Sequence, residues 1–119
     1  MYTKEDIDGL AADFEQCRKI LVALGDENRQ YMILEMMKIE DCFGVRVNEI
    51  TKRTHLSRPA VSHHLQILKD AGILKMRREG TKNYYYFDPD MKSFELLTGV
   101  LQRAIQITSE LPDRSENRI

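Results

Sequence analysis

Apolar residues recur at spacings of three and four along the first third of the chain, the period of one face of an α-helix. They predict a first helix over residues 4–24 that ends at Gly25, with its apolar face at Ile7, Leu10, Ala11, Phe14, Cys17, Ile20, Leu21 and Leu24. Asp26 is a suitable N-cap for a second helix, whose buried face is expected at Tyr31, Ile33, Leu34, Met36 and Met37. The following "EDCFGV" breaks this pattern and allows a very short strand near residues 43–45.

The middle of the chain predicts two short helices joined by a tight turn and followed by a β-hairpin. Asn48 is the expected cap of the first, in "NEITKRT", and Ser57 caps the second, which carries Pro59 in its first turn and ends at Gly72. The inner stripe of this second helix is predicted at Ala60, Val61, Leu65 and Leu68. The period then changes to two in "ILKMRREGTKNYYYFD", which predicts two strands joined at residues 79–81.

A last helix is predicted over roughly residues 90–110, with Asp88 as its cap and Pro89 in its first turn, and the polar tail 112–119 is expected to fray. Helix, turn, helix and hairpin in this order are typical of a winged helix-turn-helix. The predicted fold is therefore mainly α with a small β-hairpin, in one domain over residues 1–111.

The helix that follows Ser57 has a second face opposite its apolar stripe, on which Pro59, Ser62, His63 and Gln66 fall at positions i, i+3, i+4 and i+7. Gln66 can pair with adenine and Arg58 with guanine in the DNA major groove, and nearby basic side chains can contact phosphates. The hairpin adds basic residues that can reach the backbone or the minor groove. The predicted DNA-binding residues are Lys52, Arg53, Ser57, Arg58, Ser62, His63, His64, Gln66, Lys69, Arg77, Arg78 and Lys82.

Charge is distributed unevenly along the chain, although the net charge is only -1. Residues 46–82 contain nine basic and three acidic residues, whereas residues 1–45 contain five basic and ten acidic ones. A basic block of this kind suggests a surface that meets a polyanion such as double-stranded DNA. On charge alone, an ordinary solvated surface explains the asymmetry equally well.

Composition narrows the class of protein further. A chain of 119 residues with 42% hydrophobic residues is long enough for one packed domain. No apolar run approaches the ~20 residues that span a bilayer, and the acidic start lacks a secretory core, so we expect a cytoplasmic protein without membrane contact. The sequence has no nucleophile–base arrangement and no glycine-rich phosphate loop, which argues against an enzyme, and we expect no cofactor.

Two stretches of the sequence resemble a known family. The stretch "LGDENRQYMILEMM" (24–37) resembles the opening signature of ArsR-type bacterial winged-helix repressors, and residues 47–87 resemble that family's recognition helix and wing. The resemblance covers roughly residues 20–90. It implies a homodimer that binds an operator and changes its DNA affinity when an effector arrives, although nothing in the sequence identifies an effector.

The metal sites of that family do not carry over to this chain. Only Cys42 lies near the position of the thiol-rich motif, and the last helix has neither His nor Asp for the alternative site. Cys17 and Cys42 together would be an incomplete zinc site. We therefore expect no metal site, and we interpret both cysteines as buried or idle thiols, with a redox role as the alternative.

The two terminal helices are more apolar than the cover of so small a domain requires, which is typical of a partner site. We expect them to pair across a two-fold axis, so that the dimer binds an inverted-repeat site. The predicted interface residues are Leu10, Phe14, Phe94, Leu97, Val100, Leu101, Ala104 and Ile105. The alternative is that both helices only cover their own core.

The sequence therefore predicts a sequence-specific transcriptional regulator, most simply a homodimeric repressor. A second hypothesis keeps DNA binding but replaces the small-molecule effector by control through abundance or a partner protein. A third is a winged-helix module used only for protein–protein contact, against which the basic helix and wing argue.

Overall fold

The computed structural model describes residues 1–40 and 43–113. Within these residues the chain forms six helices and two strands. In chain order they are α1 (Lys4–Gln16), α2 (Arg18–Leu24), α3 (Glu27–Met37), α4 (Val47–Arg53), α5 (Arg58–Asp70), β1 (Leu74–Glu79), β2 (Lys82–Phe87) and α6 (Met91–Glu110). The order of helix, turn, helix and hairpin is that of a winged helix-turn-helix, as predicted.

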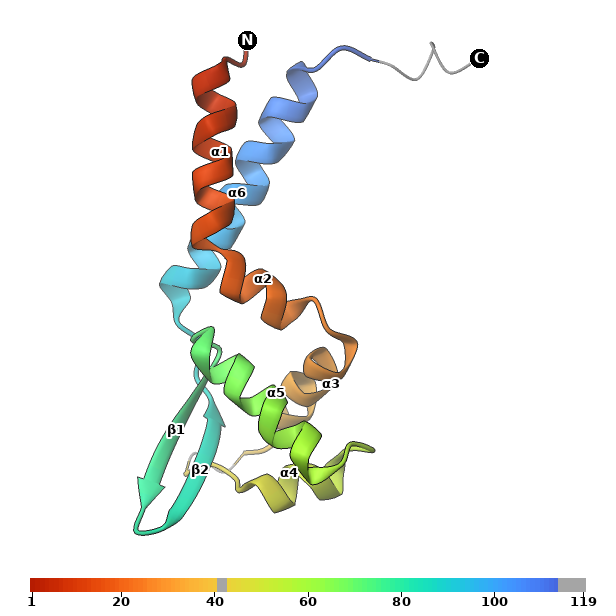
Figure 1. Ribbon diagram of the computed structural model, residues 1–119, viewed down its shortest axis with the longest axis vertical. Coiled ribbons are helices and arrows are strands. Elements are labelled where there is room, and N and C mark those ends of the chain that lie inside the picture. Colours follow the sequence, from red (N-terminus) through yellow and green to blue (C-terminus); the bar gives the residue numbers. More distant parts are fainter. Residues whose placement is uncertain (41–42, 114–119) are drawn as a thin grey trace.

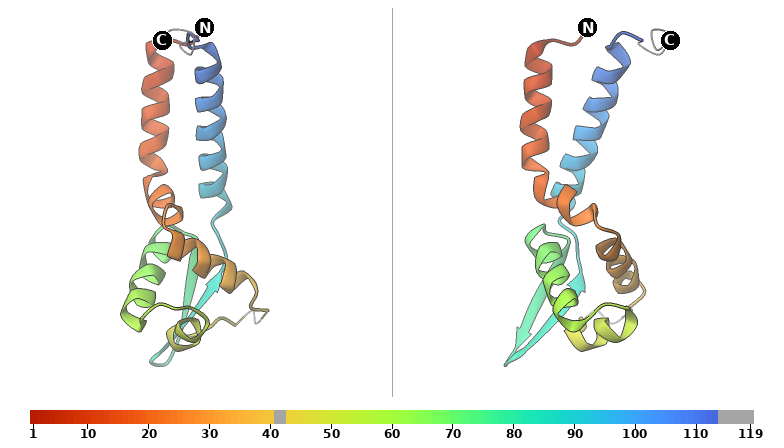
Figure 2. Two further views of the ribbon diagram at one scale, coloured as in Figure 1. Left: turned by 90° about the vertical axis from the view of Figure 1, so that its right-hand side faces the viewer. Right: turned by 45° about the vertical axis from the view of Figure 1, so that its right-hand side comes forward.

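The molecule has two regions, which Figures 1 and 2 show. The body contains α2 to α5 and the hairpin, and the stalk consists of α1 and α6, which lie side by side and extend away from the body. The radius of gyration is 18.7 Å, against roughly 13–14 Å for a compact chain of this length. Because the stalk is a single pair of helices, each of its helices has a side that the protomer does not cover.

The first predicted helix is divided at Cys17, so the prediction of one helix over residues 4–24 was wrong. The N–H of Cys17 donates to the carbonyls of Asp13 and Phe14, both at 3.1 Å, and a new helix starts after it. The break allows α1 to follow α6 while α2 turns to bury Ile20 and Ala23 in the body. The helical spacing of apolar residues continues through the bend, because α1 and α2 each have an apolar side. The two helices differ in what they pack against, which the spacing does not indicate.

The body closes around one apolar core. Val61, Leu65 and Leu68 of α5 are all fully buried, which confirms the predicted inner stripe, whereas Ala60 is only half-buried. The other members of the core are Ile20, Ala23, Met32, Ile33, Met36, Val45, Ile50, Ala71, Ile73 and Leu74. Full burial of each large side chain contributes about 1.5–3 kcal/mol, so α5 is held firmly on its apolar side.

The hairpin has the predicted position, with Leu74 opposite Phe87 and Glu79 opposite Lys82. The strand predicted near residues 43–45 is reduced to one bridge, in which Val45 and Tyr85 exchange two backbone hydrogen bonds of 2.8 Å. Gly44 has a φ of 110°, and a Cβ there would lie 2.9 Å from the carbonyl oxygen of Tyr85. Glycine is therefore required for this close approach to the wing.

Two predicted helix caps are corrected by the structure. Asn48 lies inside α4, whose N-cap is Arg46 and has no side-chain capping bond. The last helix is capped by Asp90, whose carboxylate accepts from the N–H of Lys92 at 3.0 Å. Asp88 instead pairs with Lys75 at 2.6 Å, which fastens the end of the hairpin across its two strands.

The stalk places the predicted dimer residues in different environments. Val100 is 1% exposed inside the protomer and is not available to a partner, so its assignment to the interface is corrected. Phe94 and Leu97 are half-buried against the body core, and Leu10 and Ala104 are also half-buried. The three exposed members are Phe14 (40%), Leu101 (50%) and Ile105 (69%).

Among residues 1–40 and 43–113, no helix has the length and apolar character needed to cross a bilayer. Pro112 and Asp113 are exposed, and the remainder of the predicted frayed tail lies outside the described residues.

Candidate nucleic-acid interface

The exposed face of α5 consists of polar side chains and one proline. Ser57 caps the helix by accepting from the N–H of Ala60 at 3.3 Å, and Pro59 lies in the first turn, as predicted. The exposed side chains of α5 are Arg58, Pro59, Ser62, His63, Gln66 and Asp70. The structure thus brings the predicted base-reading residues together on one accessible surface, opposite the buried stripe.

Gln66 already has a partner within the helix. Its Nε2 donates to Oδ1 of Asp70 at 2.9 Å, one turn further along α5. A base edge would therefore have to replace this exposed hydrogen bond, which costs little because both forms are hydrogen-bonded. Lys69, three residues after Gln66, is half-buried.

The basic residues of α4 differ in how they are held. Lys52 is exposed, whereas Arg53 lies 4.0 Å from a carboxylate oxygen of Glu35 on α3. The hydroxyl of Tyr31 also donates to the backbone carbonyl of Arg53 at 3.2 Å. Lys52 is therefore the better placed of the two for a contact with phosphate.

Near its tip the wing, the hairpin of β1 and β2, carries two exposed basic residues, and a third basic residue turns inward. Arg78 and Lys82 are exposed near the tip, where Nε of Arg78 donates to the Gly80 carbonyl at 3.0 Å. Arg77 is half-buried, and its guanidinium lies 4.3 Å from the ring centre of Phe43 and 5.4 Å from that of Tyr86. It also donates to the carbonyl of Phe43. Arg77 therefore fastens the wing to the residues before α4. The sequence had predicted an outward DNA contact for it and not this internal one.

A polar cleft of about 180 Å³ lies between the start of α4, the start of α5 and the wing. Arg46 and Arg58 line it from the helices, and Thr81 and Asn83 line it from the hairpin. Sequence reasoning did not assign Arg46, Thr81 or Asn83 to the site. The available signal was the membership of Arg46 in the basic block, but no motif placed it beside Arg58.

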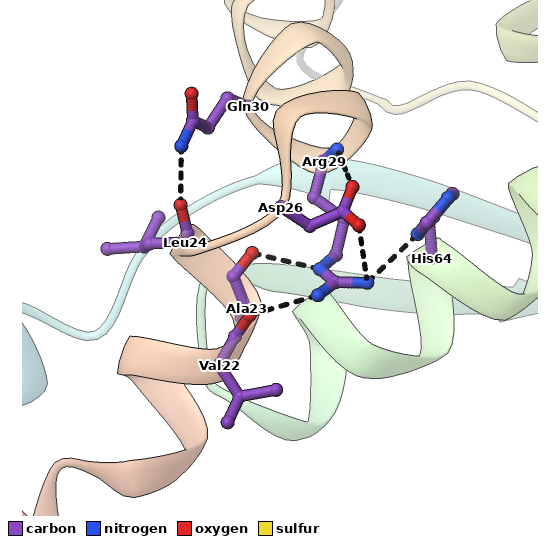
Figure 3. Close-up of polar contacts among 7 residues, drawn as sticks. All are labelled: Val22, Ala23, Leu24, Asp26, Arg29, Gln30 and His64. Carbon is purple, nitrogen blue, oxygen red and sulfur yellow. Dashed lines mark hydrogen bonds and ion pairs between the residues drawn. The ribbon is translucent and has the colours of Figure 1, made fainter.

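His64 has a different environment from its predicted one. Its side chain is buried, with 9% exposure, and Nδ1 lies 3.1 Å from Nη1 of Arg29 (Figure 3). Burial lowers the pKa of His64 below its usual 6.5; the Asp26 carboxylate opposes this, and the charges of Arg29 and His63 add to it. His64 therefore lies behind the exposed face of α5, and its burial does not fit the direct DNA contact predicted for it.

The thiols and acidic groups form no metal site in the part of the chain that the structure describes, where no group of three His, Cys, Asp or Glu side chains is suitably placed. Burial raises the pKa of the Cys17 thiol, and the nearby carboxylate of Asp13 raises it further. Cys42, the other predicted idle thiol, lies outside the described residues.

Comparison with known proteins identifies the family to which this chain belongs. Residues 26–75 match the family described as bacterial regulatory protein, arsR family. The chain is 40% identical over 79 residues to an uncharacterized HTH-type transcriptional regulator of Methanocaldococcus jannaschii, covering 65% of this chain and 83% of that protein. It is 30% identical over 98 residues to the transcriptional repressor SdpR of Bacillus subtilis, covering 82% and 94%.

The chain belongs to the ArsR family. It is therefore a DNA-binding transcriptional regulator with a winged helix-turn-helix. The fold agrees with the solution structure of a homodimeric winged helix-turn-helix domain from Mycobacterium bovis, with a TM-score of 0.57, 22% identity and coverage of 87% of this chain and 92% of that one. The matched residues include all of α4 and α5, so the family assignment and the polar face concern the same part of this regulator.

Proposed function

We propose that this regulator is a homodimeric repressor that reads an inverted-repeat operator with the exposed face of α5. The observation that carries the proposal is the opposite character of the two sides of α5, one buried and mainly apolar, the other exposed and hydrogen-bonding. A recognition helix needs this arrangement, because it must be anchored from behind while its side chains enter the major groove.

Dimerisation is supported by the stalk. Phe14, Leu101 and Ile105 are large apolar side chains that remain 40–69% exposed on a pair of helices. Asp13 and Arg103 pair at 2.6 Å and hold α1 to α6 within the protomer, so the pair is a preformed surface. A second copy related by a two-fold axis would cover both apolar faces and complete a four-helix bundle. The related domain from M. bovis is described as homodimeric.

In such a dimer the two α5 helices would enter successive major grooves about 34–36 Å apart, which requires a two-fold symmetric DNA site. Gln66 and Arg58 are the proposed base contacts, because both present groups that can form paired hydrogen bonds with purines. Lys52, Arg78 and Lys82 are the proposed phosphate contacts, and Arg46 joins them through the polar cleft. Repression is favoured by the relative SdpR, which is named a transcriptional repressor.

The test is selection of DNA by the full chain from a pool of random duplexes, followed by footprinting of the selected sequence and sedimentation of the protein alone. We expect an enriched inverted repeat, a footprint on both half-sites, and a dimer in solution. Affinity should fall steeply with salt, because phosphate contacts release counterions. A protein that enriches no sequence and binds no duplex at low salt would instead be a winged-helix module for protein contact.

A further inference from the structure

We propose that Arg29 and His64 are a positioning pair that fixes the rotation of α5 about its own axis, and thereby the angle at which its exposed face meets DNA. This inference rests on the proposed function, because it concerns how the same helix is presented to the operator.

Arg29 is held rigidly by the corner between α2 and α3. Its side chain is buried, Nε donates to the carbonyl of Ala23, and Nη2 donates to that of Val22, both at 2.9 Å (Figure 3). The guanidinium is planar, so two fixed nitrogens determine where the third one points. That third nitrogen, Nη1, faces Nδ1 of His64 on α5. The corner therefore defines one point in space to which α5 must bring an acceptor.

The contact supplies directional information that the rest of the α5 packing lacks. Val61, Leu65 and Leu68 hold the helix by apolar burial, which has little directional preference. A hydrogen bond requires a defined distance and angle. In the described part of the chain, Arg29 and His64 are the two polar side chains that are buried, and they contact each other. His64 directly follows His63 on the outer face, so a rotation at one residue moves the other.

The pair also determines the protonation state of His64. Arginine can only donate hydrogen bonds, so Nδ1 must accept and the ring proton resides on Nε2. The charged and titratable groups near the ring are Asp26, whose carboxylate lies 3.9 Å from Nη1 of Arg29, Arg29 itself and the neighbouring His63. A proton on Nδ1 would remove the acceptor and bring two cations together, so the neutral ring is the form that positions α5.

The experiment separates the two ring nitrogens with two substitutions in the full chain. In His64→Asn, the amide oxygen occupies the place of Nδ1 and can still accept from Arg29. In His64→Gln, the amide nitrogen occupies the place of Nε2, and the acceptor beside Arg29 is lost. The readout is operator selectivity, the ratio of dissociation constants for a scrambled duplex and for the duplex that the wild type selects. A tilted helix loses base contacts, each worth ~1–3 kcal/mol.

We expect His64→Gln to lose about tenfold or more in selectivity and His64→Asn to lose less than about threefold. The opposite order would show that His64 acts on DNA through Nε2, and equal effects of the two substitutions would also overturn the inference. Melting temperatures of both variants identify losses that come from unfolding.

A measurement on the wild type keeps the inference testable if either variant fails to fold. Ring ¹⁵N chemical shifts of His64 should show a proton on Nε2 and an accepting Nδ1, and Arg29→Lys should release this preference. A wild-type ring protonated on Nδ1 contradicts the positioning pair. If the wild type selects no duplex at all, the proposed function fails, whereas the ring shifts still report on the Arg29 contact independently.

Discussion

The helices α5 and α6 are both amphipathic, but their outward sides differ in kind. α5 buries Val61, Leu65 and Leu68 completely and presents hydrogen-bonding side chains outward. α6 buries Val100 inside the protomer, yet it also exposes Leu101 and Ile105 on another side. A polar outward face is suited to a hydrated, charged partner such as DNA, whereas an apolar outward face is suited to another protein surface. The same chain therefore has two kinds of surface at two ends of the molecule.

The comparison predicts that apolar residues of the two helices stabilise different equilibria. Leu65→Ala should lower the free energy of unfolding by about 2–5 kcal/mol, because it leaves a cavity in the body core. Urea unfolding at several protein concentrations measures this effect. The loss from Leu65→Ala should be the same at every concentration, whereas the loss from Leu101→Ala should grow as the protein is concentrated. At concentrations that span dissociation of the wild-type dimer, a Leu101→Ala effect independent of concentration would mean that Leu101 has no partner.

Charge placed on the stalk should break the dimer. Ile105→Glu would bury an unpaired carboxylate at the proposed interface, and we expect the dissociation constant of the dimer to rise by roughly 100-fold or more. Sedimentation equilibrium measures it. Gln106→Glu is the matched control, because it adds the same charge at the next exposed residue, ~100° around the helix. Equal sedimentation of the two variants would place the interface elsewhere.

Substitutions on the polar face should change DNA binding and leave the dimer and the stability of the fold unchanged. Gln66→Ala should cost about 1–3 kcal/mol of binding to the selected duplex and relax the preference at one base pair. Lys82→Ala, its control on the wing, should weaken binding to every duplex alike and reduce the salt slope by about one. Fluorescence anisotropy at two salt concentrations distinguishes them. If Gln66→Ala weakened selected and scrambled duplexes equally, Gln66 would not be a base contact.

Lowering the pH should reduce the stability of the fold through His64, on the buried side of α5. The pKa of His64 is lowered in the folded chain, so the unfolded state binds more protons and stability falls as the pH drops below 6.5 toward the folded-state value. Above 6.5 this contribution is fully present. His64→Asn should lack this part of the pH dependence, which denaturant unfolding over a pH series can show. Parallel stability profiles for the two proteins would contradict the assignment.

Local signals predicted the ends of α5 and the turn of the hairpin, but they were wrong for part of α3, where Tyr31, Leu34 and Met37 of the predicted buried face are exposed. Ser57 caps α5, Gly72 ends it with a φ of 78°, and Gly80 turns the hairpin with a φ of 62°, because these residue types have strong backbone preferences. Local signals were less reliable where tertiary contacts competed for a side chain. Asp88 is a good cap by type, but it pairs with Lys75, and the chain uses Asp90 instead.

The candidate site was predicted where position along one helix was sufficient. Ser62, His63 and Gln66 share a face because of helical geometry alone, and all three are exposed. Arg77 and His64 were assigned to the same surface by charge and adjacency. Their actual partners, Phe43 and Arg29, lie 34 and 35 residues away in the sequence, and nothing in the local pattern identifies such contacts.

The sequence by itself determined the order of elements, the two-sided character of α5 and the membership of the chain in its family, because periodicity, caps and glycines act over a few residues. Only the tertiary structure decided that the first helix bends at Cys17, that Val100 faces inward while Ile105 faces outward, and that His64 contacts Arg29 behind α5. These outcomes depend on which surfaces meet when distant segments pack together, and the period of a single helix is the same whichever neighbour covers it.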